Sequence, residues 1–365
     1  MINDTSKEFI KRHIGPSEED IDSMLKVVGA NSLDDLIKKT VPNNILLKDK
    51  LKIGDPTSEH ESMKQIKVIS EKNKLYTNYI GMGYYNTYMP NVVLRNIYCN
   101  PGWYTAYTPY QPEVAQGRLE MLLNFQHMVL DFTGMDIANA SLLDESTAAA
   151  EAIGLSRRLD KNNSNKVFIS RDCNPQTIDV IKTRTEVFGL KLVVGDQEKD
   201  LKSIEGNVIC GVFQYPGTLG DINDPSEAIS KIHKKNGKAI LVCDLLALAK
   251  LKTPAELGAD IAVGNSQRFG IPMGYGGPHA AFFATKDEYK RVMPGRIIGV
   301  SVDRLGKKAL RMALQTREQH IRREKATSNI CTAQALLAII SAAYAIYHGP
   351  KGINQIAERI SKLAK

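Results

Sequence analysis

The sequence predicts an α/β protein with a mainly parallel sheet sandwiched by helices. From residue 167 onward, short apolar runs alternate with helical stretches, a rhythm typical of a doubly wound sheet. The runs 238–244 and 259–265 are almost continuously apolar, as expected for strands buried on both faces. Both runs end in polar residues, and the carboxyl ends of neighbouring parallel strands usually border a ligand crevice.

The individual elements follow from the same patterns. Turn residues at 214–217 and 221–225 separate the apolar runs. After Thr285 the pattern predicts a helix, then the segment 294–303, and then a long helical tract to Tyr347. The other expected strands are 167–170, 191–194, 208–213, 239–242 and 280–284, and the other expected helices are 117–133, 176–188, 226–235 and 353–365.

Two regions precede this alternating part. Residues 1–72 predict a helical arm, in which Ser17 and Asp20 form a capping box for a helix through Val28 and a second helix covers 33–40. The loop 76–116 holds most of the tyrosines and the one tryptophan among glycines and prolines, so it cannot stay helical for long. This loop could line a substrate pocket, dock on a second subunit or simply cover a hydrophobic core. Composition alone favours the last of these interpretations.

Composition excludes several classes of protein. The first twenty residues lack the apolar stretch of a signal peptide, and the run 333–347 is too short to span a bilayer. The five cysteines are scattered and the histidines show no metal-binding spacing, which predicts a reduced cytoplasmic protein without a metal site. The formal charge of +8 is not accompanied by a recognisable nucleic-acid-binding motif. A basic surface that attracts an acidic protein partner explains the charge equally well.

Two places carry residues suited to binding an anion or a ring. Ser146 and Thr147 begin a helix rich in small residues, where free backbone N–H groups suit a phosphate; an ordinary N-cap explains the same residues. Asp244 closes an apolar strand, and it could face a ligand or cap the next helix. The glycines at 274–277 either shape the same crevice or only permit tight turns.

Long motifs resemble a known family. The segments 12–16, 107–120, 138–145, 270–279, 294–303 and 314–329 closely resemble the N-terminal half of the P-protein family of the glycine cleavage system. The resemblance covers essentially the whole chain. It implies a fold-type I pyridoxal-phosphate architecture and a glycine dehydrogenase activity, in which glycine is decarboxylated and its aminomethyl group passes to the lipoyl arm of the H-protein.

The resemblance also implies that this half needs a partner. In the family two homologous halves pair, and the Schiff-base lysine belongs to the C-terminal half or second subunit. Gln267 stands where that lysine would be, and an amide is not a nucleophilic amine. Asp244 matches the carboxylate that holds the pyridine nitrogen, while Asn174 replaces a stacking histidine. Pyridoxal phosphate is therefore expected in the partner half, with Ser146 and Thr147 as a vestigial phosphate cradle.

The role left for this chain is to complete the partner's pocket. The resemblance suggests that the aromatic loop reaches toward the lysine-bearing half, where its hydroxyls bind the phosphate or the glycine carboxylate. The residues expected to do so are Tyr84, Tyr107, Thr108 and Gln111. The large domain would span 73–305, and 306–365 would begin a small domain that is incomplete because the reading frame is truncated. The resemblance further suggests a dimer of two-half units.

Two alternatives remain open at this stage. An autonomous pyridoxal-phosphate enzyme would need another lysine; Lys250 and Lys325 lie near recognisable motifs, but neither follows the strand that should carry it. A non-catalytic scaffold would instead dock the H-protein through its basic surface.

Overall fold

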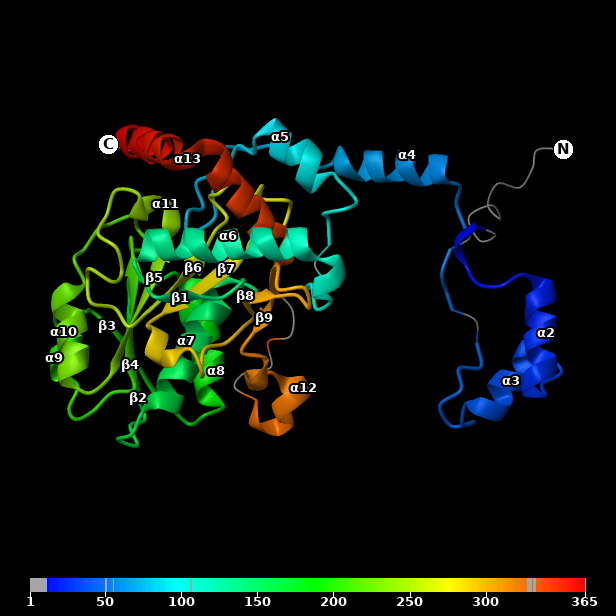
Figure 1. Cartoon of the computed structure of the whole chain (residues 1–365), viewed down its shortest axis with the longest axis horizontal. Coiled ribbons are helices and arrows are strands. Elements are labelled where there is room, and N and C mark those ends of the chain that lie inside the picture. The colour runs from blue at the N-terminus through cyan, green and yellow to red at the C-terminus, as the bar shows by residue number, and fades with distance from the viewer. Residues whose placement is uncertain are drawn as a thin grey trace. The chain divides into compact units, whose positions relative to one another are not determined.

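The computed structural model describes residues 12–49, 51–54, 56–105, 107–326, 330 and 333–364 (Figure 1). The chain forms two compact units, one ending at Thr77 and one beginning at Asn78. None of the helices in the described ranges is long and apolar enough to cross a membrane.

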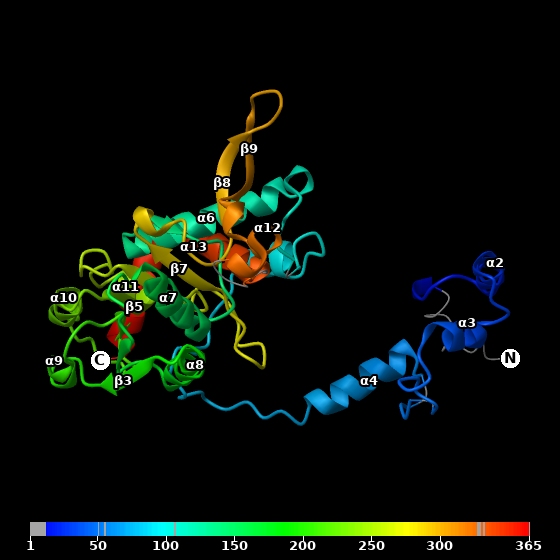
Figure 2. The same ribbon diagram turned by 90° about the horizontal axis from the view of Figure 1, so that it is seen from below.

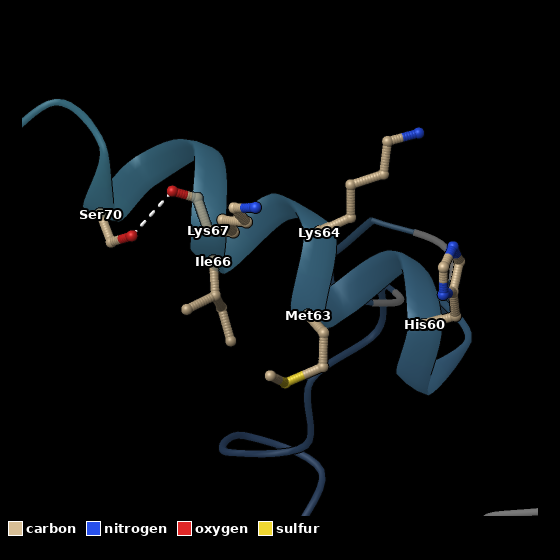
Figure 3. Close-up of a pocket in the computed structure, with 6 residues that line it drawn as sticks. All are labelled: His60, Met63, Lys64, Ile66, Lys67 and Ser70. Carbon is tan, nitrogen blue, oxygen red and sulfur yellow. Dashed lines mark hydrogen bonds between the residues drawn. The ribbon is translucent and has the colours of Figure 1, made fainter.

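In its described residues, the first unit contains the helices α2 (Glu18–Val28), α3 (Leu33–Thr40) and α4 (Glu59–Ser70). The expected capping box is confirmed: the Asp20 N–H donates to Ser17 Oγ over 3.2 Å, and the Ser17 N–H donates to Asp20 Oδ2 over 3.0 Å. On α4, Met63 and Ile66 project from one side of the helix and Lys64 from another (Figure 3). These residues come from a single helix, so they do not enclose a site.

The second unit is organised around a seven-stranded sheet with the order β1-β7-β6-β5-β4-β2-β3. Strands β2 to β6 run parallel and β7 runs antiparallel, which confirms a mainly parallel sheet. The strands are β1 (Ile137–Ala138), β2 (Lys166–Ser170), β3 (Lys191–Gly195), β4 (Cys210–Tyr215), β5 (Lys238–Asp244), β6 (Ile261–Asn265) and β7 (Ala281–Thr285).

Helices cover both faces of this sheet, as Figure 1 shows. The adjacent residues Phe282 and Phe283 are both fully buried yet belong to different hydrophobic clusters, because successive side chains of a strand point to opposite faces. One face packs on α7 (Glu145–Leu159) and α8 (Pro175–Glu186); the other packs on α6 (Gln116–Thr133), α9 (Asp200–Ser203), α10 (Ser226–Lys234), α11 (Leu245–Leu248) and α13 (Ala335–Ala364).

The region after β7 differs from the sequence prediction. The expected long helical tract to Tyr347 is wrong, because its first part pairs as an antiparallel hairpin. Only the last part is helical, in α13, which has a non-helical Gly349 inside it. Between β7 and α13 lie η4 (Asp287–Tyr289), β8 (Ile297–Val302), β9 (Lys308–Ala313), η5 (Gln315–Arg317), α12 (Gln319–Arg322) and η6 (Arg323–Lys325).

The aromatic loop is irregular, as expected. In its described part it contains only short helical pieces, α5 (Asn91–Val93), η2 (Leu94–Tyr98) and η3 (Pro112–Val114). Its residues 82–87 extend to the carboxyl ends of the central strands, where Gln176 and Gln267 bond to its backbone.

Candidate functional site

A polar cluster occupies the carboxyl edge of the parallel sheet. Asp244 ends β5 and Asn265 ends the neighbouring strand β6. These two residues pair with each other in the register of the sheet. Glu145 begins α7 and Asn174 caps α8, so both helices place a polar side chain at this edge. The crevice at the ends of adjacent parallel strands is where α/β proteins commonly bind ligands, which makes this cluster the first candidate for a site.

Glu145 lies at the centre of the cluster. Its side chain is buried, and its two oxygens accept hydrogen bonds from Asn174 Nδ2 at 3.0 Å and Asn265 Nδ2 at 2.7 Å. Burial raises the pKa of Glu145 to about 7, against the opposing effect of these amide donors. This carboxyl group therefore changes its charge near neutral pH.

Asp244 is occupied by the chain itself. Its Oδ2 forms an ion pair with Arg268 Nη1, and its Oδ1 accepts from the Leu246 N–H at 2.9 Å. The capping role of Asp244 is therefore confirmed. The Arg268 guanidinium in turn lies over the Tyr85 ring, 4.9 Å from its centroid. The carboxylate that would hold a pyridine nitrogen thus already has a permanent cation beside it.

Gln267, the residue in the lysine position, is fully buried. Its Nε2 donates to the carbonyl oxygens of Tyr85 and Ile271, each over 2.7 Å, and its Oε1 accepts from the Tyr85 N–H over 3.4 Å. The amide thus pairs with both backbone groups of Tyr85, as a neighbouring strand would. The Gln267 side chain therefore anchors the aromatic loop, and it does not provide a nucleophile.

The N-terminus of α7 is also satisfied within the chain. The Thr147 N–H donates to Asp144 Oδ1 at 2.8 Å, and the Glu145 N–H donates to His279 Nε2 at 3.4 Å. The buried Ser146 hydroxyl bonds to the Thr177 hydroxyl at 3.1 Å. Asp144 is therefore the N-cap of α7 and holds the Thr147 N–H, while the Ser146 hydroxyl bonds to α8.

The aromatic loop fills what remains. The Tyr84 ring meets His279 edge-on with centroids 5.9 Å apart, and it lies so close to Gly277 that a Cβ there would be 2.6 Å from Tyr84 Cε1. Gln176 Nε2 holds the Met82 carbonyl at 2.8 Å. The space left between these residues is about 10 Å³, no more than a single water molecule.

Pyridoxal phosphate does not fit these residues. The amine is replaced by an amide, and the carboxylate and the helix N-terminus are engaged within the chain. Residues 82–84 take up the remaining volume. No reaction step can therefore be assigned to the cofactor in this pocket.

The other residues expected at a partner's pocket lie elsewhere, beside Arg296 and Ala333. Thr108 is buried, and its Oγ1 accepts from the Ala333 N–H at 3.0 Å. Tyr107 is 60% exposed and packs edge-on against Tyr110, which accepts from Arg296 Nη2 at 2.9 Å. Gln111 is exposed. The structure thus keeps Tyr84 in the filled pocket and presents Tyr107 and Gln111 at the surface.

Neither alternative lysine lines the pocket. Lys250 pairs with Glu358 of α13 at 3.9 Å, and Lys325 is exposed in η6. Sequence reasoning singled out neither Glu145 nor Arg268. The carboxylate at the start of the alanine-rich helix was a signal for Glu145, and the polar tip after β6 was a signal for Arg268.

The fold of this chain is also found in several enzymes. A sphingosine-1-phosphate lyase from Burkholderia pseudomallei superposes with a TM-score of 0.58 at 12% identity, covering 86% of this chain and 73% of the other. A cysteine desulfurase from Thermococcus onnurineus gives 0.52 at 18% identity, covering 78% of this chain and 70% of the other. At such low identity these likenesses show only the fold, which is that of fold-type I pyridoxal-phosphate enzymes.

Closer relatives define the family. Residues 11–365 match the family model described as glycine cleavage system P-protein, and this chain belongs to that family. A crystal structure of glycine decarboxylase (P-protein) in inhibitor-bound form has a TM-score of 0.84 at 35% identity, covering 94% of this chain and 78% of the other.

The sequence relatives are longer than this chain. Glycine dehydrogenase (decarboxylating) from Pelagibacter ubique is 74% identical over the whole chain, and its counterpart from Nostoc punctiforme is 58% identical. The chain spans only 38% and 37% of their respective lengths and corresponds to their N-terminal half.

Proposed function

We propose that this chain is the N-terminal half of a glycine decarboxylase and that it completes the active site of a lysine-bearing half. The assembled protein would decarboxylate glycine with pyridoxal phosphate and pass the aminomethyl group to the lipoyl arm of the H-protein. The cofactor, bound by the partner half, supplies the electron sink for this decarboxylation. This chain contributes shape and hydrogen-bonding groups.

The observation that carries this proposal is the state of Gln267. A buried amide that bonds to the backbone of Tyr85 and Ile271 cannot act as the amine of a Schiff base, so the reaction needs a lysine from elsewhere. The exposed side chains of Tyr107 and Gln111 are available to a partner.

The decisive experiment is glycine–bicarbonate carbon exchange in the presence of H-protein and pyridoxal phosphate. It compares this chain alone, the lysine-bearing remainder of the Pelagibacter ubique relative alone, and their mixture. We expect substantial exchange only in the mixture. Exchange by this chain alone would refute the complementing role and support an autonomous enzyme. Docking of H-protein without any exchange in the mixture would favour the scaffold.

We also propose a cytoplasmic location. It is supported by the thiols of Cys99, Cys173, Cys210 and Cys243, which are all free in the structure. A fractionation experiment that found the protein outside the cytoplasm would contradict it.

A further inference from the structure

The hairpin of β8 and β9 leaves the body of the second unit. Figure 2 shows it projecting beyond the helices and the sheet. Its root is part of the core, since Ile298 and Met312 are only 3% and 4% exposed. Its outer part is not, since Val300 is 60% and Val302 is 65% exposed.

These side chains share one face of the hairpin. Ile298, Val300 and Val302 are two residues apart, so they point the same way along the strand. Their partners across the hairpin are Met312, Leu310 and Lys308. The face therefore begins as part of the buried core and continues, still apolar, into solvent.

The turn between the strands has a fixed conformation at the tip of the hairpin. Asp303 Oδ1 accepts from the N–H groups of Leu305 at 2.8 Å and Lys307 at 2.9 Å. Gly306 takes a φ of 77°, which glycine adopts without strain. Leu305 is held at the tip with 70% of its surface exposed. We call Val300, Val302 and Leu305 the hairpin strip.

Basic side chains surround the hairpin strip. The exposed cations are Arg304, Lys307, Lys308 and Arg311, and the carboxylate of Asp303 is engaged by the turn. An apolar centre with a charged rim is the usual anatomy of a protein interface. The matching surface would be apolar with an acidic rim.

We propose that the hairpin strip docks on the lysine-bearing half of the P-protein, an inference that rests on the proposed function. The relatives carry more than half of their length beyond the part that matches this chain. Uncovered apolar strand faces promote association, and a two-stranded hairpin is only marginally stable by itself. A partner that covers the hairpin strip would both bury its apolar side chains and stabilise the hairpin.

The root of the hairpin is bonded to the end of the aromatic loop. The Gln116 side chain donates to the Leu310 carbonyl and accepts from the Leu310 N–H, each over 2.9 Å. Arg296, just before β8, donates to the Tyr110 hydroxyl. The hairpin is therefore fastened to the loop that presents Tyr107 to the partner half. One partner seated on that loop would also meet the strip.

A double variant with Val302→Asp and Leu305→Asp tests this interface. Both positions are exposed, so the unfolding midpoint should not change. The matched control is Val187→Asp, 82% exposed at the end of α8, which packs beside the edge strand β3. Each protein is titrated onto the immobilised lysine-bearing remainder of the Pelagibacter ubique relative at low and high salt.

We expect the double variant to bind at least about tenfold more weakly than wild type and the control to stay within about twofold. Added salt should weaken wild-type binding because the rim is charged. Binding of the double variant within twofold of wild type would overturn the docking site while leaving the proposed function intact. If wild type does not bind at all, the proposed function fails as well.

A second copy of this chain is the competing occupant. Sedimentation of the chain alone distinguishes it. The chain could sediment as a dimer that the double substitution converts to a monomer, while binding to the lysine-bearing half stays unchanged. That result would contradict the proposal that the lysine-bearing half covers the hairpin strip.

Discussion

Gln267 shows how one residue changes the use of a pocket. Its amide donates to the carbonyl oxygens of Tyr85 and Ile271 and accepts from the Tyr85 N–H, so it ties the aromatic loop to the turn after β6. A lysine at this position would find the same two carbonyl oxygens, and its ammonium group would donate to them. Replacing the amide alone therefore does not recreate a cofactor site.

We accordingly predict that Gln267→Lys does not gain a Schiff base with pyridoxal phosphate. The pocket would still be filled by Tyr84 and Tyr85, and Asp244 would still pair with Arg268. The measurement is the near-visible absorption band and its trapping by borohydride. The C-terminal remainder of the Pelagibacter ubique relative, which we propose carries the lysine, is the positive control. A trapped adduct on residue 267 would contradict this prediction, because it would show that the aromatic loop moves out of the pocket readily.

Glu145 gives a prediction with a defined pH window. Its pKa of about 7 in the folded protein lies above the ordinary value of 4.5, so the folded state binds more protons than the unfolded chain between these values. Stability from this group is present at low pH and is lost as the pH rises to about 7. The shift corresponds to about 3 kcal/mol.

Glu145→Gln removes this titration. Relative to wild type, its free energy of unfolding should rise by about 2 to 3 kcal/mol between about pH 5 and about pH 8. Urea unfolding at both pH values measures it, with the exposed Glu120→Gln as the matched control. An equal difference at the two pH values would mean that Glu145 titrates as an ordinary exposed carboxyl group.

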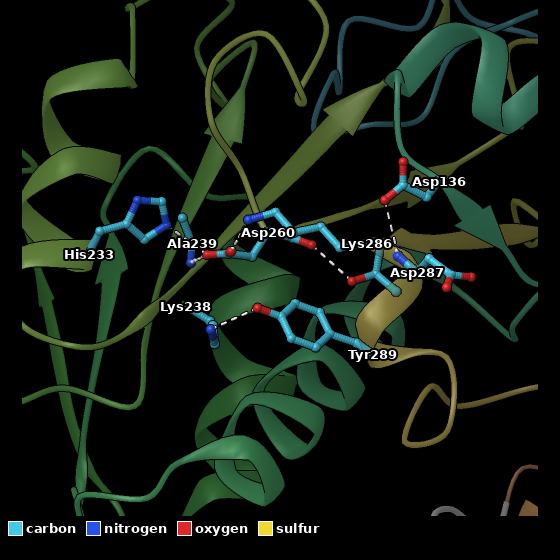
Figure 4. Close-up of polar contacts among 9 residues, drawn as sticks. Asp136, His233, Lys238, Ala239, Asp260, Lys286, Asp287 and Tyr289 are labelled. Carbon is cyan, nitrogen blue, oxygen red and sulfur yellow. Dashed lines mark hydrogen bonds and ion pairs between the residues drawn. The ribbon is translucent and has the colours of Figure 1, made fainter.

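At the scale of elements, Asp260 joins several of them at the opposite edge of the sheet (Figure 4). This buried residue just before β6 bonds to His233 of α10 at 2.7 Å, to the Ala239 N–H of β5 at 2.8 Å and to Lys286 after β7 at 2.5 Å. Despite burial, its bonds to Lys286, Ala239 and His233 hold the pKa of Asp260 below its usual value. The carboxylate is therefore charged in the folded protein.

Asp260→Asn should destabilise the protein by about 3 kcal/mol, because it leaves Lys286, the His233 ring and the Ala239 N–H without their anionic partner. The wild-type advantage should shrink as the pH falls below the ordinary pKa of 3.8, since a carboxylate with a lowered pKa stabilises only while ionised. Urea unfolding measures both. Asp287→Asn, an exposed residue in the same region, is the control and should change stability by less than about 0.5 kcal/mol.

Elements also show what the sequence could predict. The strands β5 and β6 were predictable because burial on both faces demands continuous apolar runs. The hairpin of β8 and β9 could not be predicted, because residues 308–313 are mostly good helix formers. They are a strand only through distant contacts with β8 and Gln116.

The same distinction holds at the site. The strand-end position of Asp244 and the amide at Gln267 could be read from the sequence. The filling of the pocket could not, because Tyr85 and Gln267 are 182 positions apart and their pairing exists only in the folded chain. Likewise the raised pKa of Glu145 comes from burial, which no local pattern encodes.

At the scale of the whole molecule, the two units differ in how much they bury. The hydrophobic clusters of the second unit contain only residues from Val93 onward. Among the described residues of the first unit, the buried apolar side chains are Leu25 and Ala30. The described core residues that cover the sheet thus come from the second unit.

We predict that a protein lacking residues 1–77 still folds cooperatively, with a free energy of unfolding within about 1 kcal/mol of the full chain. Urea denaturation followed by circular dichroism measures this. As a comparison, removing residues 335–365 deletes the core residues Ile339, Tyr344 and Ile353 and should abolish the cooperative transition. Loss of that transition on removing the arm instead would mean that the sheet needs the first unit to close its core.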